Sequence, residues 1–116
     1  MKKIFLYCFV IFLAIVVSCT SSKKADNNYP SWVKDLISSF EKENAHAQIK
    51  EYNYNGRPVY LISNCYLCPD AMDIVYDKEN NKVCEFGGIA GRNTCPDFDQ
   101  KASDKKIVWQ NKNFEY

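Results

Sequence analysis

The sequence contains a single histidine, His46, and no long run of basic residues. His46 lies just after an expected helix. A protonated imidazole interacts favourably with the carbonyl groups at the end of a helix, so we interpret His46 as a surface or capping residue. The chain has 15 basic and 14 acidic side chains. This balance argues against a nucleic-acid-binding protein, because such proteins cluster Lys and Arg against several phosphates.

Two common ligand motifs are also absent. The four glycines lack the G-x-G-x-x-G spacing of a phosphate-binding loop. Four carboxylates lie close together in the sequence but do not follow the D-x-D-x-D-G pattern of a calcium loop. They are Asp70, Asp73, Asp77 and Glu79. We interpret them as part of a solvated turn, and the sequence predicts neither a metal site nor a cofactor.

Residues 1–18 have the pattern of an export signal. Two lysines, an uncharged run over residues 4–17 and the small Ser18 precede Cys19. As a helix the run spans about 21 Å, less than the ~30 Å hydrocarbon core, so a permanent span is disfavoured. The residues V-V-S-C resemble a bacterial lipobox, whose cysteine carries diacylglycerol after cleavage in front of it. Cys19 is therefore the expected lipidation site.

Residues 19–30 are expected to form the lipidated cysteine and a flexible tether. Residues 20–30 contain no aliphatic side chain larger than alanine, so they cannot bury themselves. Each buried CH₂ of an acyl chain contributes about 0.8 kcal/mol, so two or more chains hold a protein firmly at a bilayer. The lipid bilayer is thus an expected partner, bound through Cys19.

Residues 31–116 are expected to fold as a small α+β domain, in which an amphipathic N-terminal helix packs on about four antiparallel strands. The helix is predicted by one apolar stripe after Ser31, its expected N-cap. The stripe consists of Val33, Leu36, Ile37 and Phe40. A length of 116 residues excludes a multidomain enzyme.

The strands are predicted by alternating and β-branched residues, with turn residues between them. Four of them fall at residues 47–54, 59–62, 74–76 and 83–86, and residues 107–109 offer a last short strand. In the first strand the apolar residues occupy odd positions up to residue 49 and even positions from residue 52. This change predicts a bulge near residues 50–51. Asn55 and Gly56 predict a type I′ hairpin that places Tyr54 beside Arg57. The polar residues 77–82 predict a second hairpin.

Four cysteines remain once Cys8 is removed with the signal and Cys19 is lipidated. They are Cys65, Cys68, Cys84 and Cys95. An even number in an exported domain indicates disulfides, each worth about 2–4 kcal/mol. We favour bonds that join Cys65 and Cys68 to Cys84 and Cys95, because a bond within C-Y-L-C would constrain little chain. The order within that arrangement stays open.

Several blocks of the sequence resemble a family of uncharacterised domains in small exported proteins and lipoproteins of Bacteroidota. In chain order the blocks are NGRPVYLIS, CPDAMDIVYD, VCEFGGIAG, TCPDF and IVW. The resemblance covers nearly the whole domain and implies no activity. Family members carry two adjacent cysteines at this point of the sequence. In this chain Cys65 stands three residues before Cys68 instead, so the pairing in the family is not carried over to Cys65.

Two chemical interpretations of the cysteines are weaker. A C-x-x-C pair after a strand permits thiol-disulfide exchange, but the chain lacks the alternating β and α pattern of a thioredoxin. A closed zinc site needs two compact ligand pairs, whereas Cys84 and Cys95 are far apart in sequence. Most of the many aromatic residues are expected in the core. Tyr66, which lies between two cysteines, is the first candidate for exposed recognition.

The sequence thus predicts a lipid-anchored envelope protein whose domain binds an unknown envelope protein or ligand without catalysis. The residues after Cys19 lack the acidic character of a surface-export tag in Bacteroidota lipoproteins, which favours the outer membrane facing the periplasm. An inhibitor of an envelope protease or other hydrolase is the alternative, presenting residues 64–72 or 87–96 as a loop. A thiol-disulfide oxidoreductase that uses Cys65 and Cys68 is a lesser alternative.

Overall fold

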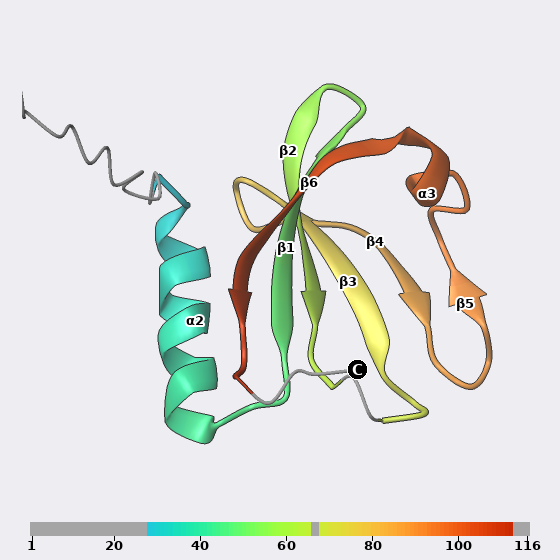
Figure 1. The fold of residues 1–116 in the computed structure, drawn as a ribbon. Helices are drawn as coiled ribbons and strands as arrows, with labels where there is room; N and C mark the ends of the chain where they lie inside the picture. The colour runs from blue at the N-terminus through green and yellow to red at the C-terminus, as the bar shows by residue number, and fades with distance from the viewer. Residues whose placement is uncertain (1–27, 66–67, 113–116) are drawn as a thin grey trace, which may run out of the picture.

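A computed structural model describes residues 28–65 and 68–112. Within these ranges two helices accompany six strands (Figure 1). In chain order the elements are α2 (Ser31–Glu43), β1 (Gln48–Tyr54), β2 (Arg57–Ser63), β3 (Met72–Asp77), β4 (Lys82–Gly87), β5 (Arg92–Asn93), α3 (Phe98–Lys101) and β6 (Ala102–Gln110). The α+β class predicted from the sequence is confirmed.

All strand pairs are antiparallel, and the strands form one sheet in the order β5-β4-β3-β2-β1-β6. Strands β1 to β5 follow one another as a meander. Strand β6 then crosses back to pair with β1, at the far side of the sheet from β5 (Figure 1). The first and last strands of the domain are therefore neighbours.

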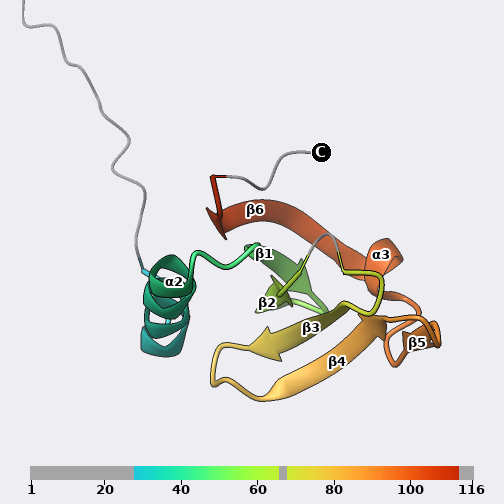
Figure 2. The same cartoon turned by 90° about the horizontal axis from the view of Figure 1, so that it is seen from below.

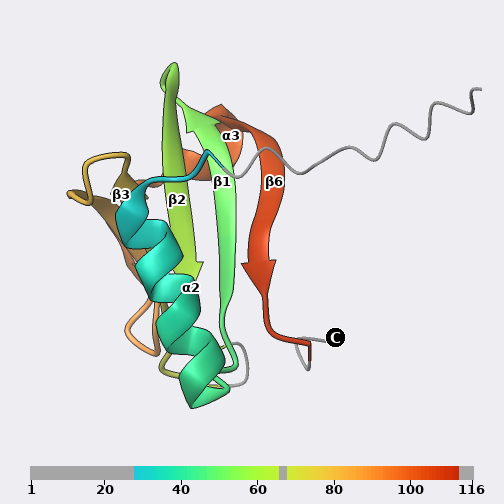
Figure 3. The same ribbon diagram turned by 90° about the vertical axis from the view of Figure 1, so that its left-hand side faces the viewer.

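Helix α2 covers one face of the sheet, across β1 and β2 (Figure 3). Val33 and Phe40 are buried there against Ile49, Tyr60 and Ile62. The predicted apolar stripe is confirmed, because its other members, Leu36 and Ile37, pack against the same cluster. This burial, about 25 cal/mol per Å² of apolar surface, is what holds the helix on the sheet.

The prediction of Ser31 as the N-cap is wrong. Pro30 occupies that position, and its carbonyl accepts hydrogen bonds from the amides of Val33 and Lys34 at 3.1 and 3.3 Å. Ser31 is the first helical residue instead, and no side chain caps the helix. At the other end Asn44 adopts a left-handed conformation with φ 50°, which ends the helix.

The opposite face of the sheet is covered by α3 and the segment before it (Figure 2). The Phe98 ring of α3 lies 5.3 Å from Tyr52, 5.1 Å from Tyr54 and 5.5 Å from Phe86, measured between ring centroids. The buried residues of this second cluster are Tyr54, Val59, Leu61, Val75, Cys84, Cys95 and Phe98. Both faces of the central strands are thus buried.

This two-sided burial explains the change of parity in β1. The predicted bulge is absent from the pairing with β2, which runs without a shift from Gln48 to Tyr54. Ile49 packs under α2, whereas Tyr52 and Tyr54 pack under α3, so apolar residues occur on both parities. The register shift at Ile49/Lys50 exists only in the pairing with β6, where β6 carries the extra residue.

The two predicted hairpins are confirmed. Asn55 and Gly56 have φ of 52° and 77°, the positive values that a type I′ turn requires, and Tyr54 pairs with Arg57. The second hairpin joins β3 to β4. The prediction of about four strands is too low, because the two residues of β5 are too few to give a pattern. Most of β6 is exposed, so only its end near residues 107–109 has a strand signature.

Candidate functional site

The four cysteines of the domain form two disulfides, Cys65–Cys68 and Cys84–Cys95. The favoured cross-pairing is therefore wrong. Cys84 lies in β4, and the β4–β5 hairpin returns the chain so that the Cα atoms of Cys84 and Cys95 are 5.7 Å apart. Both are nearly buried, at 4% and 5% exposure, whereas Cys65 is half-buried and Cys68 is exposed.

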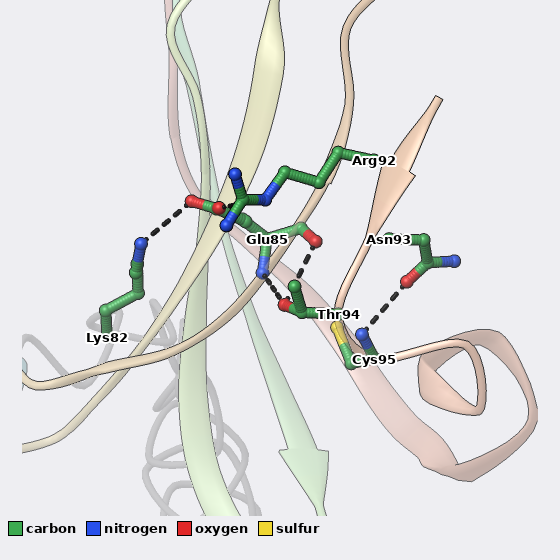
Figure 4. A network of polar contacts seen from close by, with 6 residues as sticks. All are labelled: Lys82, Glu85, Arg92, Asn93, Thr94 and Cys95. Atoms are coloured by element: carbon green, nitrogen blue, oxygen red, sulfur yellow. Dashed lines mark hydrogen bonds and ion pairs between the residues drawn. The ribbon is translucent and has the colours of Figure 1, made fainter. Parts of the chain in front are cut away.

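Glu85, next to Cys84, is a mostly buried carboxylate in β4, with 9% exposure. Two cations neutralise it (Figure 4): the Lys82 Nζ lies 2.9 Å from its Oε2, and the Arg92 Nε lies 2.6 Å from its Oε1. The hydrogen bond from Lys82, together with the charge of Arg92, holds the pKa of Glu85 below its ordinary value. Because it is ionised and paired, Glu85 is suited to a structural role rather than to acid catalysis.

Further hydrogen bonds hold the residues after β5 against β4 (Figure 4). The amide of Glu85 donates to the Thr94 hydroxyl at 2.9 Å, and the Thr94 amide donates to the Glu85 carbonyl at 2.9 Å. The amide of Cys95 donates to the Asn93 side chain at 2.9 Å. We call residues 87–95 the braced loop, because the disulfide, the ion pair and these hydrogen bonds fix both of its ends.

The tip of the braced loop is a turn over residues 88–91, closed by a hydrogen bond from the Gly91 amide to the Gly88 carbonyl at 3.1 Å. The Gly88 amide donates to the Ala71 carbonyl at 3.0 Å, which ties the turn to the segment before β3. Ile89 stands at the first central position and is 77% exposed. Turns usually present Gly, Pro, Asn, Asp or Ser, so an exposed β-branched side chain here needs an explanation.

The glycines of this loop adopt backbone angles that other residues rarely adopt. Gly87, Gly88 and Gly91 have φ of 109°, 74° and 61°. At Gly87 a Cβ would also lie 3.0 Å from the Ala71 carbonyl oxygen, so the backbone of β4 approaches this segment too closely for any side chain.

The acidic residues between the cysteine blocks do not converge. Asp77 accepts hydrogen bonds from the amides of Glu79 and Asn81 and so caps the β3–β4 turn. These bonds, above all those from Asn81, lower its pKa. Asp73 accepts a hydrogen bond from the Ser63 hydroxyl at 2.6 Å. Among the described residues no group of three or more His, Cys, Asp or Glu side chains is placed to hold a metal ion.

His46 is exposed in the connection between α2 and β1. Two tyrosines of the strands, Tyr54 and Tyr60, have raised pKa values. The Tyr54 hydroxyl donates to Asp97 at 2.8 Å, and this bond raises the pKa of Tyr54. Burial, together with the nearby Glu51, raises the pKa of Tyr60 to about 12. Neither phenol is therefore activated as a nucleophile or base near neutral pH.

Two predicted site residues, Cys19 and Tyr66, lie outside the described residues. The structure fixes both ends of residues 87–95, most of the loop that the sequence proposes over residues 87–96, and places Ile89 at its tip. Its sequence signal is the block G-G-I-A-G, a loop segment whose turn holds aliphatic residues between glycines and no polar side chain. The sequence did not predict the ion pair between Glu85 and Arg92, because the two residues meet only when β4 pairs with β5. The described helices include none long and apolar enough to span a membrane.

Residues 35–111 match a family model described as a domain of unknown function, DUF6970. The match includes the whole sheet and most of α2. Searches of curated proteins and of solved structures gave no match.

Proposed function

This chain belongs to the DUF6970 family of domains of unknown function, and from that premise we propose that it is a lipid-anchored envelope protein whose domain binds another protein through the braced loop. The observation that carries this proposal is the exposure of Ile89, 77%, on a turn whose two ends are fixed. A large apolar side chain held outside the core on a fixed turn is available for contact with an apolar pocket of a partner.

The bracing favours tight binding, because a loop that is already ordered loses little conformational entropy when it docks. Ile89 offers an aliphatic anchor, and the small neighbours Gly88 and Ala90 leave its sides accessible. An anchor of this kind is effective when it fills a desolvated pocket at the centre of an interface. The expected partner is therefore a protein with an apolar pocket.

A site-specific crosslink tests this proposal. A photoreactive amino acid replaces Ile89 in the full chain in its native host, and a parallel chain carries it at Ile107. Ile107 is the matched control, because it is also an exposed isoleucine, at 53%, but lies on β6 at the other edge of the sheet. We expect a discrete protein adduct from position 89 and not from position 107.

Competition separates a specific partner from random capture. Excess wild-type protein should suppress the adduct, whereas excess Ile89→Ser protein should not. Adducts of equal yield from both positions, or suppression by the Ile89→Ser protein, would contradict the role of the loop. Because Ile89 is so exposed, its replacement should change the free energy of unfolding by less than about 0.5 kcal/mol.

The lipid anchor and the envelope location are proposed from the sequence of residues 1–30. The lipobox-like segment supports acyl chains on Cys19, and the outer membrane facing the periplasm is the proposed location. Tyr29 and Pro30, which lead into α2, are the first half-buried residues of the described chain, and the tether over residues 19–30 is proposed from its sequence alone.

Inhibition of an envelope hydrolase is a second candidate function. Of the two loops proposed for it, the braced loop is a better candidate than residues 64–72. A loop held by a disulfide keeps one conformation in the groove of an enzyme. If the crosslinked partner is a protease or other hydrolase, the purified protein should lower its activity, and the Ile89→Ser variant should not. An unchanged activity at saturating protein would exclude inhibition.

Thiol-disulfide exchange is a lesser candidate, favoured by the Cys65–Cys68 pairing and by the exposure of Cys68. One thiolate of an external dithiol would attack a sulfur of this bond and form a mixed disulfide. This first attack releases one cysteine as a thiolate, and the second thiol of the reagent then releases the other cysteine and leaves the reagent as a cyclic disulfide. Titration with dithiothreitol, read as free thiols per chain, tests this. If the protein exchanges disulfides, Cys65 and Cys68 should form two accessible thiols reversibly while the Cys84–Cys95 bond stays intact.

A further inference from the structure

A groove of about 390 Å³ lies between α2 and strands β2 and β3. Its lining residues are Trp32, Leu36, Ile62, Asn64, Ile74, Tyr76 and Asn80. The volume is in the range of small-ligand sites, roughly 300–1,000 Å³. It is on the α2 face of the sheet, whereas the braced loop follows β4, so it is a separate site.

The walls of this groove carry no Asp, Glu, Lys or Arg among the described residues. Three other grooves of the described chain differ in this respect. One is lined by Glu41 and Lys112, one by Lys34, and one by Arg57 and Asp77. An uncharged wall disfavours an ionic ligand, because a charge moved out of water needs a partner. The groove is therefore complementary to a neutral ligand.

Trp32 and Tyr76 give the groove its aromatic character. Their ring centroids are 5.8 Å apart with the planes tilted by 59°, and Trp32 also meets Tyr60 edge-on at 5.6 Å. The Trp32 Nε1 donates to the Lys78 carbonyl at 3.0 Å, which fixes the indole against the β3–β4 turn. Aromatic faces carry partial negative charge and attract the C–H groups of a ligand that lies flat on them.

Asn64 and Asn80 supply the polar groups of the groove. Both are exposed, and within the described chain neither side-chain amide has a hydrogen-bond partner. Each carboxamide offers two donors and one acceptor oxygen. Asn80 has φ 68°, so the turn that follows β3 fixes its backbone in the left-handed region.

We propose that this groove binds a neutral saccharide. A pyranose ring has an apolar C–H face for Trp32 and Tyr76 and hydroxyls for the carboxamides of Asn64 and Asn80. A peptide is a poorer fit, because its backbone amides bind best along an open sheet edge, whereas β2 and β3 both lie inside the sheet. The groove thus adds an unassigned binding site whose ligand is an uncharged sugar.

Tryptophan fluorescence tests the proposal on the full chain, kept in a detergent without a sugar headgroup. The sequence has two tryptophans, so Trp109→Phe leaves Trp32 as the reporter, and Trp32→Phe leaves Trp109. Chitotriose and cellotriose serve as neutral probes. We expect a saturable change in Trp32 emission with at least one of them in the Trp109→Phe chain, and no change in the Trp32→Phe chain, which lacks the indole that the ligand would stack on.

Substitutions of the two asparagines identify the site by calorimetry. Asn64→Ala and Asn80→Gly remove the carboxamides, and glycine keeps the positive φ of residue 80. Each should weaken binding about two- to tenfold, the value of one hydrogen bond. Asn53→Ala is the matched control, since Asn53 is an exposed asparagine of β1 that does not line the groove. It should bind as the wild type does.

Three results would overturn the proposal. The first is an unchanged Trp32 emission at millimolar saccharide, with circular dichroism showing an intact fold. The second is equal weakening by Asn80→Gly and Asn53→Ala, which would place the ligand elsewhere. The third is a response to the neutral dipeptide leucyl-leucinamide but to neither saccharide, which would assign the groove to peptides.

Discussion

The Arg92 Nε lies 2.6 Å from the Glu85 Oε1, so the short strand β5 is tied to β4 by a charge pair as well as by its backbone. Glu85 is mostly buried, whereas the Arg92 side chain is 62% exposed. Together with Lys82, this contact determines how the braced loop responds to acid.

The first prediction concerns pH. The pKa of Glu85 in the folded chain lies below its ordinary value of 4.5, because Lys82 donates to it and Arg92 is close. Its contribution to stability is therefore present above pH 4.5 and is lost as the pH falls through the lowered pKa. Urea unfolding across this range should show a loss of stability that is smaller in the Glu85→Gln variant. Parallel curves for the two proteins would contradict the assignment.

The second prediction concerns the two disulfides. Closing the longer loop between Cys84 and Cys95 is worth about 3 kcal/mol, and closing the short Cys65–Cys68 loop less than about 2 kcal/mol. Cys84 and Cys95 are also nearly buried in the core. The variant with both Cys84 and Cys95 replaced by alanine should therefore unfold at a lower urea concentration than the variant with both Cys65 and Cys68 replaced. Equal midpoints would show that the Cys84–Cys95 bond stabilises the domain no more than the short bond does.

The third prediction compares two isoleucines. Ile49 is fully buried between β1 and α2, so Ile49→Ala should lower the free energy of unfolding by about 2–5 kcal/mol. Ile107 is 53% exposed on β6, and Ile107→Ala should cost less than about 0.5 kcal/mol. Chemical denaturation of both variants measures the difference. Similar losses would contradict the position of the core.

The fourth prediction concerns the proposed anchor. Wild-type protein from its native host should carry acyl chains on Cys19 as its first residue, whereas Cys19→Ser removes the sulfur that holds them. Mass spectrometry of the intact protein should therefore detect lipid on the wild type and none on the variant. An unmodified Met1 in the wild-type protein, or its release into the medium, would be incompatible with a lipoprotein.

Local patterns predicted the parts of the fold that depend on near neighbours. The stripe from Val33 to Phe40 marks α2, since side chains three and four residues apart share a helix face. Asn55 and Gly56 mark the hairpin, since few other residues tolerate positive φ at both positions. These signals hold because the interactions behind them span few residues.

The parts that failed depend on contacts between distant segments. The pairing of β6 with β1 has no local signature, because exposed Lys105 and Lys106 hide its strand pattern. The disulfide preference assumed that cross-links close long loops, whereas the β4–β5 hairpin brings Cys84 to Cys95. Ile89 escaped notice because a lone apolar residue in a loop gains significance only once its exposure is known.

The pairing of β6 with β1 bears on how the domain reaches its native state. A polypeptide that emerges from its amino end can form the β1–β2 and β2–β3 ladders early. Its outer β1 edge stays open until residues 102–110 have emerged, and Trp109 joins the cluster under α2 only then. Completion of the sheet therefore waits until nearly the whole polypeptide has emerged.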